Sequence, residues 1–177
     1  MAAGAKGFTD WIAATAPSVL IQHNEAWVIP TVQSIHIAGI GVVLACILML
    51  TLRILGYAGM DQTLTQTLDR FGPWLKWALW VLLGTGILMI IGEPERELIT
   101  FSFWAKMTLV VLGTGIAFGF QRLLKSRGPD FEKSLETRRE VKVMAVATLV
   151  IWLTIVFLGR FIAYDHIWGP LSPATKA

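Results

Sequence analysis

Cysteine is almost absent from this chain of 177 residues, which contains Cys46 alone. A single cysteine cannot form a disulfide within the chain, and it excludes a CxxC metal or redox motif. Cys46 also lies inside a long apolar stretch, which predicts a small side chain packed against helices or lipid. The sequence therefore predicts no disulfide or thiol chemistry.

Charged residues are scarce too, at 15% against about 25% in soluble domains. Apolar residues make up 55%, and they occur in long blocks separated by the charges. The pI of about 9.2 alone would allow a nucleic-acid partner. However, the basic residues stand in loops beside apolar blocks, which is typical of membrane proteins, so we predict a lipid bilayer as partner and no nucleic acid.

The first residues lack the basic start and continuous apolar core of a signal peptide. Phe8, Trp11 and Leu20 are instead spread among polar residues. We predict that residues 1–26 form an amphipathic segment at the membrane interface, as one or two short helices broken at Pro17 and restarted by Ser18 as a cap.

Four apolar segments are long enough to cross a bilayer, which takes about 20 residues. The predicted fold is all-α, an integral membrane four-helix bundle over residues 27–164. A tail follows at 165–177. Gly72-Pro73 is predicted to mark the entry of the second span. The spans lie at about 27–52, 74–91, 101–120 and 143–163.

The basic residues predict how the bundle is oriented. The two loops between spans one and two and between spans three and four, with their flanks, carry ten Lys and Arg residues. The other side has only Lys6, Arg96 and Lys176 outside the spans. The positive-inside rule places the two loops in the cytoplasm. We therefore expect a multi-pass protein of the bacterial inner membrane with both termini in the periplasm.

A short repeat occurs in the second and third spans. Residues 83–87 and 112–116 both have the sequence Leu-Gly-Thr-Gly-Ile. Small residues allow helix backbones to approach closely, and threonine can form hydrogen bonds across the contact. The repeat predicts close packing between spans two and three.

Three ionisable residues within the spans are candidates for a functional site: His36, Lys106 and Arg160. A charge at the centre of a span costs about 2.5 kcal/mol or more, which makes each a candidate. The topology brings all three to the outer half of the bundle. Alternatives remain open: Lys106 and Arg160 could reach the outer headgroups, and His36 could bond a neighbouring helix through Thr31, Gln33 or Ser34.

An imidazole and two cations in one layer suit an anionic ligand. Haem b fits, with His36 as an axial ligand to iron and Lys106 and Arg160 beside the propionates. His166 is the candidate second metal ligand, if the end of span four folds back over the site. A quinone or a lipid phosphate would also fit.

Copper is the other metal that the sequence allows. His23, His36 and His166 could act with Met49, Met89 or Met107. The chain has no HxH or MxxM cluster, however, and Lys106 and Arg160 would repel a bare cation. A hydrolase is disfavoured because the bundle has no Ser/His/Asp pattern or paired carboxylates.

Seven short motifs stand out along the chain: Trp27–Pro30, Ser34–Gly39, Leu52–Gly56, Pro73-Trp74, Thr85-Gly86, Phe103–Met107 and Gly159–Tyr164. Together they resemble a bacterial family of uncharacterised inner-membrane proteins. The resemblance covers most of residues 8–164, although Thr51 stands where that family has an acidic residue. The family's four-helix architecture is distantly similar to the CopD copper-resistance membrane domain and to transmembrane b-type cytochromes. The resemblance singles out His36, Lys106 and Arg160 again.

These observations lead to one main hypothesis and two alternatives. The main one is an accessory or electron-transfer membrane subunit that binds haem b or quinone and works with other membrane or periplasmic subunits. We expect that it is not an enzyme itself. The first alternative is a CopD-like protein that takes up or handles copper. The second is a cofactor-free scaffold of a larger membrane complex.

Overall fold

The computed structural model describes residues 2–127 and 138–162. This part of the chain is helical and contains no strand, which confirms the predicted all-α class. The helices are α1 (Ala2–Ala13), α2 (Ala16–His23), α3 (Glu25–Leu55), α4 (Leu64–Gly92), α5 (Pro94–Leu98), α6 (Phe101–Arg127) and α8 (Arg139–Phe161).

Four of these helices, α3, α4, α6 and α8, are long and apolar enough to cross a membrane. Their 23 to 31 residues exceed the predicted apolar spans at most ends. The 31 residues of α3 correspond to about 46 Å at ~1.5 Å per residue, against a hydrocarbon thickness of about 30 Å. The long helices therefore extend beyond the apolar layer that they can span.

The start of α4 differs from the prediction. Gly72-Pro73 lies inside the helix, which begins at Leu64. The reason is a capping box: the Thr63 hydroxyl accepts from the Gln66 N–H, and the Gln66 side chain accepts from the Thr63 N–H. This local signal fixes the start about two and a half turns before the proline.

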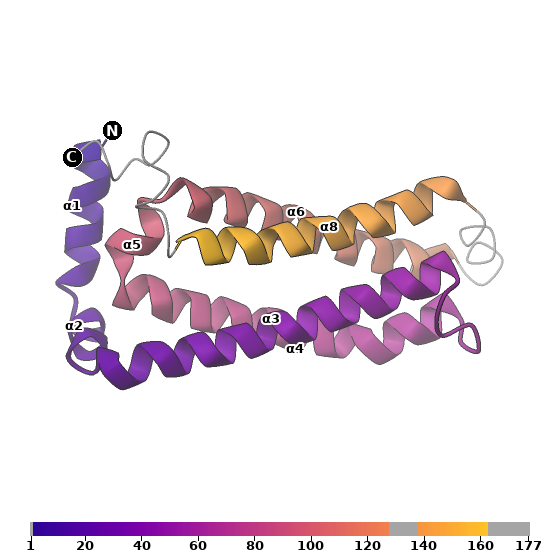
Figure 1. Ribbon diagram of the computed structural model, residues 1–177, viewed down its shortest axis with the longest axis horizontal. Helices are drawn as coiled ribbons and strands as arrows, with labels where there is room; N and C mark the ends of the chain where they lie inside the picture. The colour runs from indigo at the N-terminus through magenta and orange to yellow at the C-terminus, as the bar shows by residue number, and fades with distance from the viewer. Residues whose placement is uncertain (1, 128–137, 163–177) are drawn as a thin grey trace.

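The long helices form two antiparallel pairs, α3 with α4 and α6 with α8 (Figure 1). Helix α3 also packs along α8, whereas α4 and α6 meet in few places. The mid-bundle core is centred on Val43 and Trp152, and a second cluster around Leu64 and Leu124 lies where α3 connects to α4. We call that end of the bundle the loop end, and the end that carries α5 the α5 end.

The Leu-Gly-Thr-Gly-Ile repeats do not pack against each other, so the predicted contact between spans two and three is wrong. On α4, a Cβ added to Gly86 would lie 3.9 Å from His36 Cε1 of α3. On α6, a Cβ added to Gly113 would lie 3.1 Å from Trp152 Nε1 of α8. Each repeat instead allows close approach within its own antiparallel pair. Gly84 and Gly115 are exposed, with nothing within 4 Å of an added Cβ.

Helices α1 and α2 lie across the α5 end of the bundle (Figure 1). Pro17 stands in the first turn of α2. The prediction that Ser18 caps this helix is wrong, because α2 begins at Ala16 and Thr15 is the residue before it. The fully buried Ser18 hydroxyl donates to the Ile91 carbonyl of α4 at 2.6 Å. Tight packing reinforces this contact: a Cβ on Gly92 would lie within 3 Å of Ile21 and Ile29.

Arg53 is one of the ten basic residues counted in the loops and their flanks, but it is buried at 5% exposure. Its Nε donates to the Gln62 carbonyl at 2.7 Å and so closes the turn between α3 and α4. Gly56 ends α3 with φ +86°, a conformation that favours glycine. The Leu52–Gly56 motif therefore has a structural role.

The outer surface of the bundle is apolar. Ile37, Trp80, Val111 and Phe157 lie on the four long helices, and each is more than 60% exposed. Large exposed apolar surfaces mark contact with lipid or protein. Together with the helix lengths, this surface fits a multi-pass membrane protein.

Candidate functional site at the α5 end of the bundle

His36 is held by a residue of the neighbouring helix. Its ring Nδ1 lies 2.7 Å from the Thr85 hydroxyl of α4. That hydroxyl also lies 2.7 Å from the Val81 carbonyl, which can only accept, so it donates its single hydrogen there. It must then accept from His36, which places the proton of the neutral imidazole on Nδ1. The lone pair on Nε2 is left available to a ligand or a proton.

His36 does bond a neighbouring helix, but not through the residues that sequence analysis offered. The hydroxyls of Thr31 and Ser34 donate to carbonyls of their own helix, those of Trp27 and Pro30. The partner is the threonine of the repeat in α4. Thr85 could have been found from sequence by matching its depth to that of His36 in an antiparallel pair.

Lys106 projects from α6 into the same region. Its Cδ lies 3.7 Å from the position of a Cβ on Gly159 of α8, so this glycine leaves room for the aliphatic stem. Its Nζ lies 5.5 Å from the centre of the buried Phe103 ring. Lys106 is close enough to both His36 and Glu97 for their charges to interact. His36 and Lys106 therefore lie within electrostatic range of each other, and their membership of one ligand site stays a prediction.

Glu97 is the site residue that sequence analysis missed. It is only 8% exposed, in the short helix α5 between the second and third spans. Burial raises the pKa of its carboxyl, while Lys106 and Arg96 lower it and Glu93 raises it. The available signal was Pro94: it starts α5, and a residue three positions later shares its buried face.

Arg160 and His166 complete the predicted set. Arg160 follows Gly159 on α8 and is exposed, so its side chain is not buried among the other three. His166 lies outside the described residues. His23 is exposed at the end of α2. No group of three or more His, Cys, Asp or Glu that could hold a metal ion occurs within residues 2–127 and 138–162.

The site thus combines an imidazole, an ammonium and a buried carboxyl from α3, α6 and α5. Each of these groups can gain or lose a proton. Ionisable groups inside an apolar bundle often line proton or substrate paths. This arrangement suits a polar ligand that exchanges protons or carries negative charge.

The chain belongs to a family of unknown function, DUF6644, whose model matches residues 9–165. This confirms the expected membership of an uncharacterised family. No curated protein and no solved structure matches the chain. The similarity to the CopD domain and to b-type cytochromes stays a prediction. The family match includes His36, Thr85, Glu97 and Lys106 and ends one residue before His166.

Proposed function

We propose that the protein is a membrane subunit that binds a quinone head group at the α5 end of the bundle and serves electron transfer. The observation that supports this most is the proximity of His36, Lys106 and Glu97. Quinone chemistry couples electron transfer to protonation, and all three groups carry or accept protons. An apolar bundle also matches the apolar body of a quinone.

Each residue has a role in this proposal. Lys106 Nζ donates to a carbonyl oxygen of the quinone, and His36 Nε2 accepts from a hydroxyl group of the quinol. Glu97 offsets the charge of Lys106 and can hold a proton, because burial raises the pKa of its carboxyl. The electrons come from or go to a separate haem or iron–sulfur subunit.

Haem b is the second candidate. A histidine that ligates a metal usually donates its other ring N–H to a fixed acceptor, which is the state of His36 beside Thr85. Lys106 and Arg160 would pair with the propionates, and His166 would supply the second ligand.

Copper has less support. The described residues bring one histidine to the site, and Lys106 repels a bare cation.

The proposed orientation follows the basic residues. The loop end carries Arg70, Lys76, Arg122 and Lys125, so it faces the cytoplasm of a bacterial inner membrane. Both termini and the His36 site then lie on the periplasmic side. A reporter that works only in the periplasm should be active when fused after Ala177 and silent near Arg127. The reverse pattern would contradict the orientation.

The test is ligand binding by the purified protein. We expect retained quinone in an organic extract, and saturable quenching of tryptophan fluorescence by a short-chain ubiquinone. Lys106→Met should weaken ubiquinone binding about tenfold or more, because it removes a charge-assisted hydrogen bond. His36→Gln should weaken binding of the reduced ubiquinol about fivefold, because it removes a neutral hydrogen bond. The exposed residues His23 and Lys6 provide matched controls, as His23→Gln and Lys6→Met.

The same samples separate the alternatives. A Soret band with reducible α and β bands, lost in His36→Gln, would replace quinone by haem b. Stoichiometric copper without haem would favour copper handling. If no ligand is extracted and neither the parent nor the variants bind ubiquinone or ubiquinol saturably, the proposal is wrong and the cofactor-free scaffold is favoured. Equal binding by the parent and all four variants would overturn the assigned site.

A further inference from the structure

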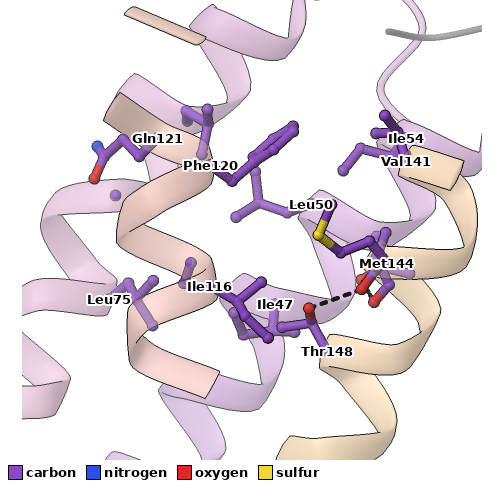
Figure 2. Close-up of a pocket in the computed structure, with 15 residues that line it drawn as sticks. Ile47, Leu50, Ile54, Leu75, Ile116, Phe120, Gln121, Val141, Met144 and Thr148 are labelled. Carbon is purple, nitrogen blue, oxygen red and sulfur yellow. Dashed lines mark hydrogen bonds between the residues drawn. The ribbon is translucent and has the colours of Figure 1, made fainter. Parts of the chain in front are cut away.

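A second region of interest lies in the loop-end half of the bundle, away from His36. There the four long helices enclose a cavity of about 60 Å³. Figure 2 shows Phe120 and Ile116 of α6 pointing toward Leu50 and Ile47 of α3. Met144 lies on the α8 side of the same space. The walls are therefore mainly aliphatic and aromatic.

The polar side chains around this cavity are largely satisfied by backbone. The Thr148 hydroxyl donates to the Met144 carbonyl at 2.8 Å (Figure 2). The Thr51 hydroxyl lies 3.4 Å from the Ala145 carbonyl. An apolar cavity that held benzene in another protein measured about 150 Å³, so ~60 Å³ is too narrow for an aromatic ring but admits part of a thin acyl chain.

An open groove of about 690 Å³ lies beside the cavity, between α4 and α6. Its lining includes three cations, Lys76, Arg122 and Lys125. Lys125 forms an ion pair of 2.7 Å with Asp69, which leaves Lys76 and Arg122 without an ion pair among the described residues. The groove therefore has a positive charge that complements an anionic group.

Gln121 lines both the cavity and the groove. Its side chain points toward α4, and its Nε2 lies 2.9 Å from the position of a Cβ on Gly72. Since α4 and α6 meet in few places, this contact is a main closure of the seam between them. In this contact the flexible amide of Gln121 packs against Gly72, which has no side chain. A lipid acyl chain can therefore displace the Gln121 side chain.

We infer that the seam between α4 and α6 binds an anionic phospholipid. The phosphate lies in the groove near Lys76 and Arg122, and one acyl chain passes Gly72 and Gln121 into the cavity. Basic pockets between transmembrane helices bind anionic headgroups in this way. The inference uses none of the residues of the quinone site, so the two proposals stand or fall separately.

The first test measures the charge dependence of lipid binding by native mass spectrometry in detergent. Dioleoyl phosphatidylglycerol should bind more tightly than dioleoyl phosphatidylcholine. Lys76→Gln and Arg122→Gln should each weaken phosphatidylglycerol binding about fivefold, since a basic residue contributes about that factor at a membrane surface. Arg70→Gln is the matched control, because Arg70 is exposed on α4 but does not line the groove.

The second test concerns the acyl chain. Gly72→Leu should block the seam and weaken dioleoyl phosphatidylglycerol binding, whereas Gly84→Leu, on the exposed face of α4, should not. Dihexanoyl phosphatidylglycerol should bind the parent protein more weakly than dioleoyl phosphatidylglycerol does. This comparison needs no variant. Melting curves without lipid identify a variant that has not folded.

Three results would overturn the inference. The first is equal binding of phosphatidylglycerol and phosphatidylcholine. The second is an equal loss in Arg70→Gln and Arg122→Gln. The third is evidence for a site for a free anion. Equal binding of the short-chain and long-chain lipids, or displacement of both by millimolar inorganic phosphate, would provide that evidence.

Discussion

Replacing Thr85 by valine tests the hydrogen bond that orients His36. Valine has nearly the shape of threonine but lacks the hydroxyl, so His36 Nδ1–H would lose its acceptor. Hydrogen bonds between transmembrane helices average about 0.6 kcal/mol and reach about 1.7 kcal/mol. A buried donor without a partner costs about 1–3 kcal/mol. Because His36 is only half-buried, we expect Thr85→Val to destabilise the bundle by about 1 kcal/mol.

The repeat provides a matched control in Thr114, the equivalent threonine of α6. Its hydroxyl is buried and has no hydrogen-bond partner in the described part of the chain. Thr114→Val therefore removes an unsatisfied polar atom and should leave stability unchanged or raise it by up to about 1 kcal/mol. Thr85→Ser retains a hydroxyl and should keep most of the His36 interaction. The same substitution thus has opposite expected effects in two identical pentapeptides.

Reversible unfolding in mixed detergent and dodecyl sulfate micelles can measure these differences. A double-mutant cycle with His36→Leu isolates the interaction, and we expect a coupling free energy of about 0.6–1.7 kcal/mol between positions 36 and 85. The cycle between positions 36 and 114 should give zero within error. Equal effects of the two valine substitutions, or no coupling between 36 and 85, would refute the stabilising hydrogen bond between His36 and Thr85.

Three further predictions use the same unfolding assay. Arg53→Met should cost about 1.5–3 kcal/mol because it removes the buried charged donor that closes the α3–α4 turn, while Arg70→Met at the exposed surface should change little. Gly92→Ala should cost about 1–3 kcal/mol through overpacking, whereas Gly84→Ala should stabilise α4 by up to ~1 kcal/mol through helix propensity. Burial raises the pKa of Glu97 above its ordinary 4.5, so the folded state holds this proton more tightly than the unfolded state. The free energy of unfolding should therefore fall as pH rises from 4.5 to the folded pKa. Glu97→Gln should remove this pH dependence, and a variant with the same pH profile as the parent would contradict the prediction.

The four spans, and the depth of the ionisable residues within them, could be predicted because membrane physics constrains them strongly. An apolar block of about 20 residues has few alternatives to a spanning helix. Once the chain order fixes the direction of each helix, the depth of a residue follows from its distance to the helix end. This is why His36 and Lys106 were expected at a similar depth, and their charges do interact although they are 70 positions apart in the sequence. Arg160, which was expected beside them, is exposed.

Neighbour relations could not be predicted in the same way. The repeats at 83–87 and 112–116 show that close packing occurs, but small residues do not specify which helix approaches them. Ser18 is a typical cap, yet its hydroxyl donates to a carbonyl of α4 instead. Glu97 lies among the charges of a hairpin, and its burial depends on the orientation of a helix of five residues. Each of these outcomes depends on tertiary contacts.

The stability of the bundle does not explain why Lys106 and Glu97 lie in its interior. Their charges influence each other without forming an ion pair among the described residues. Even a buried ion pair can often be replaced by apolar residues without loss of stability, because desolvation offsets the attraction between the charges. The ring of Phe103 adds only about 0.5–2 kcal/mol as a cation–π partner of Lys106. An apolar pair at these positions would pack α5 onto the bundle at lower cost. The charges beside His36 therefore favour a ligand or a proton as the partner of this site.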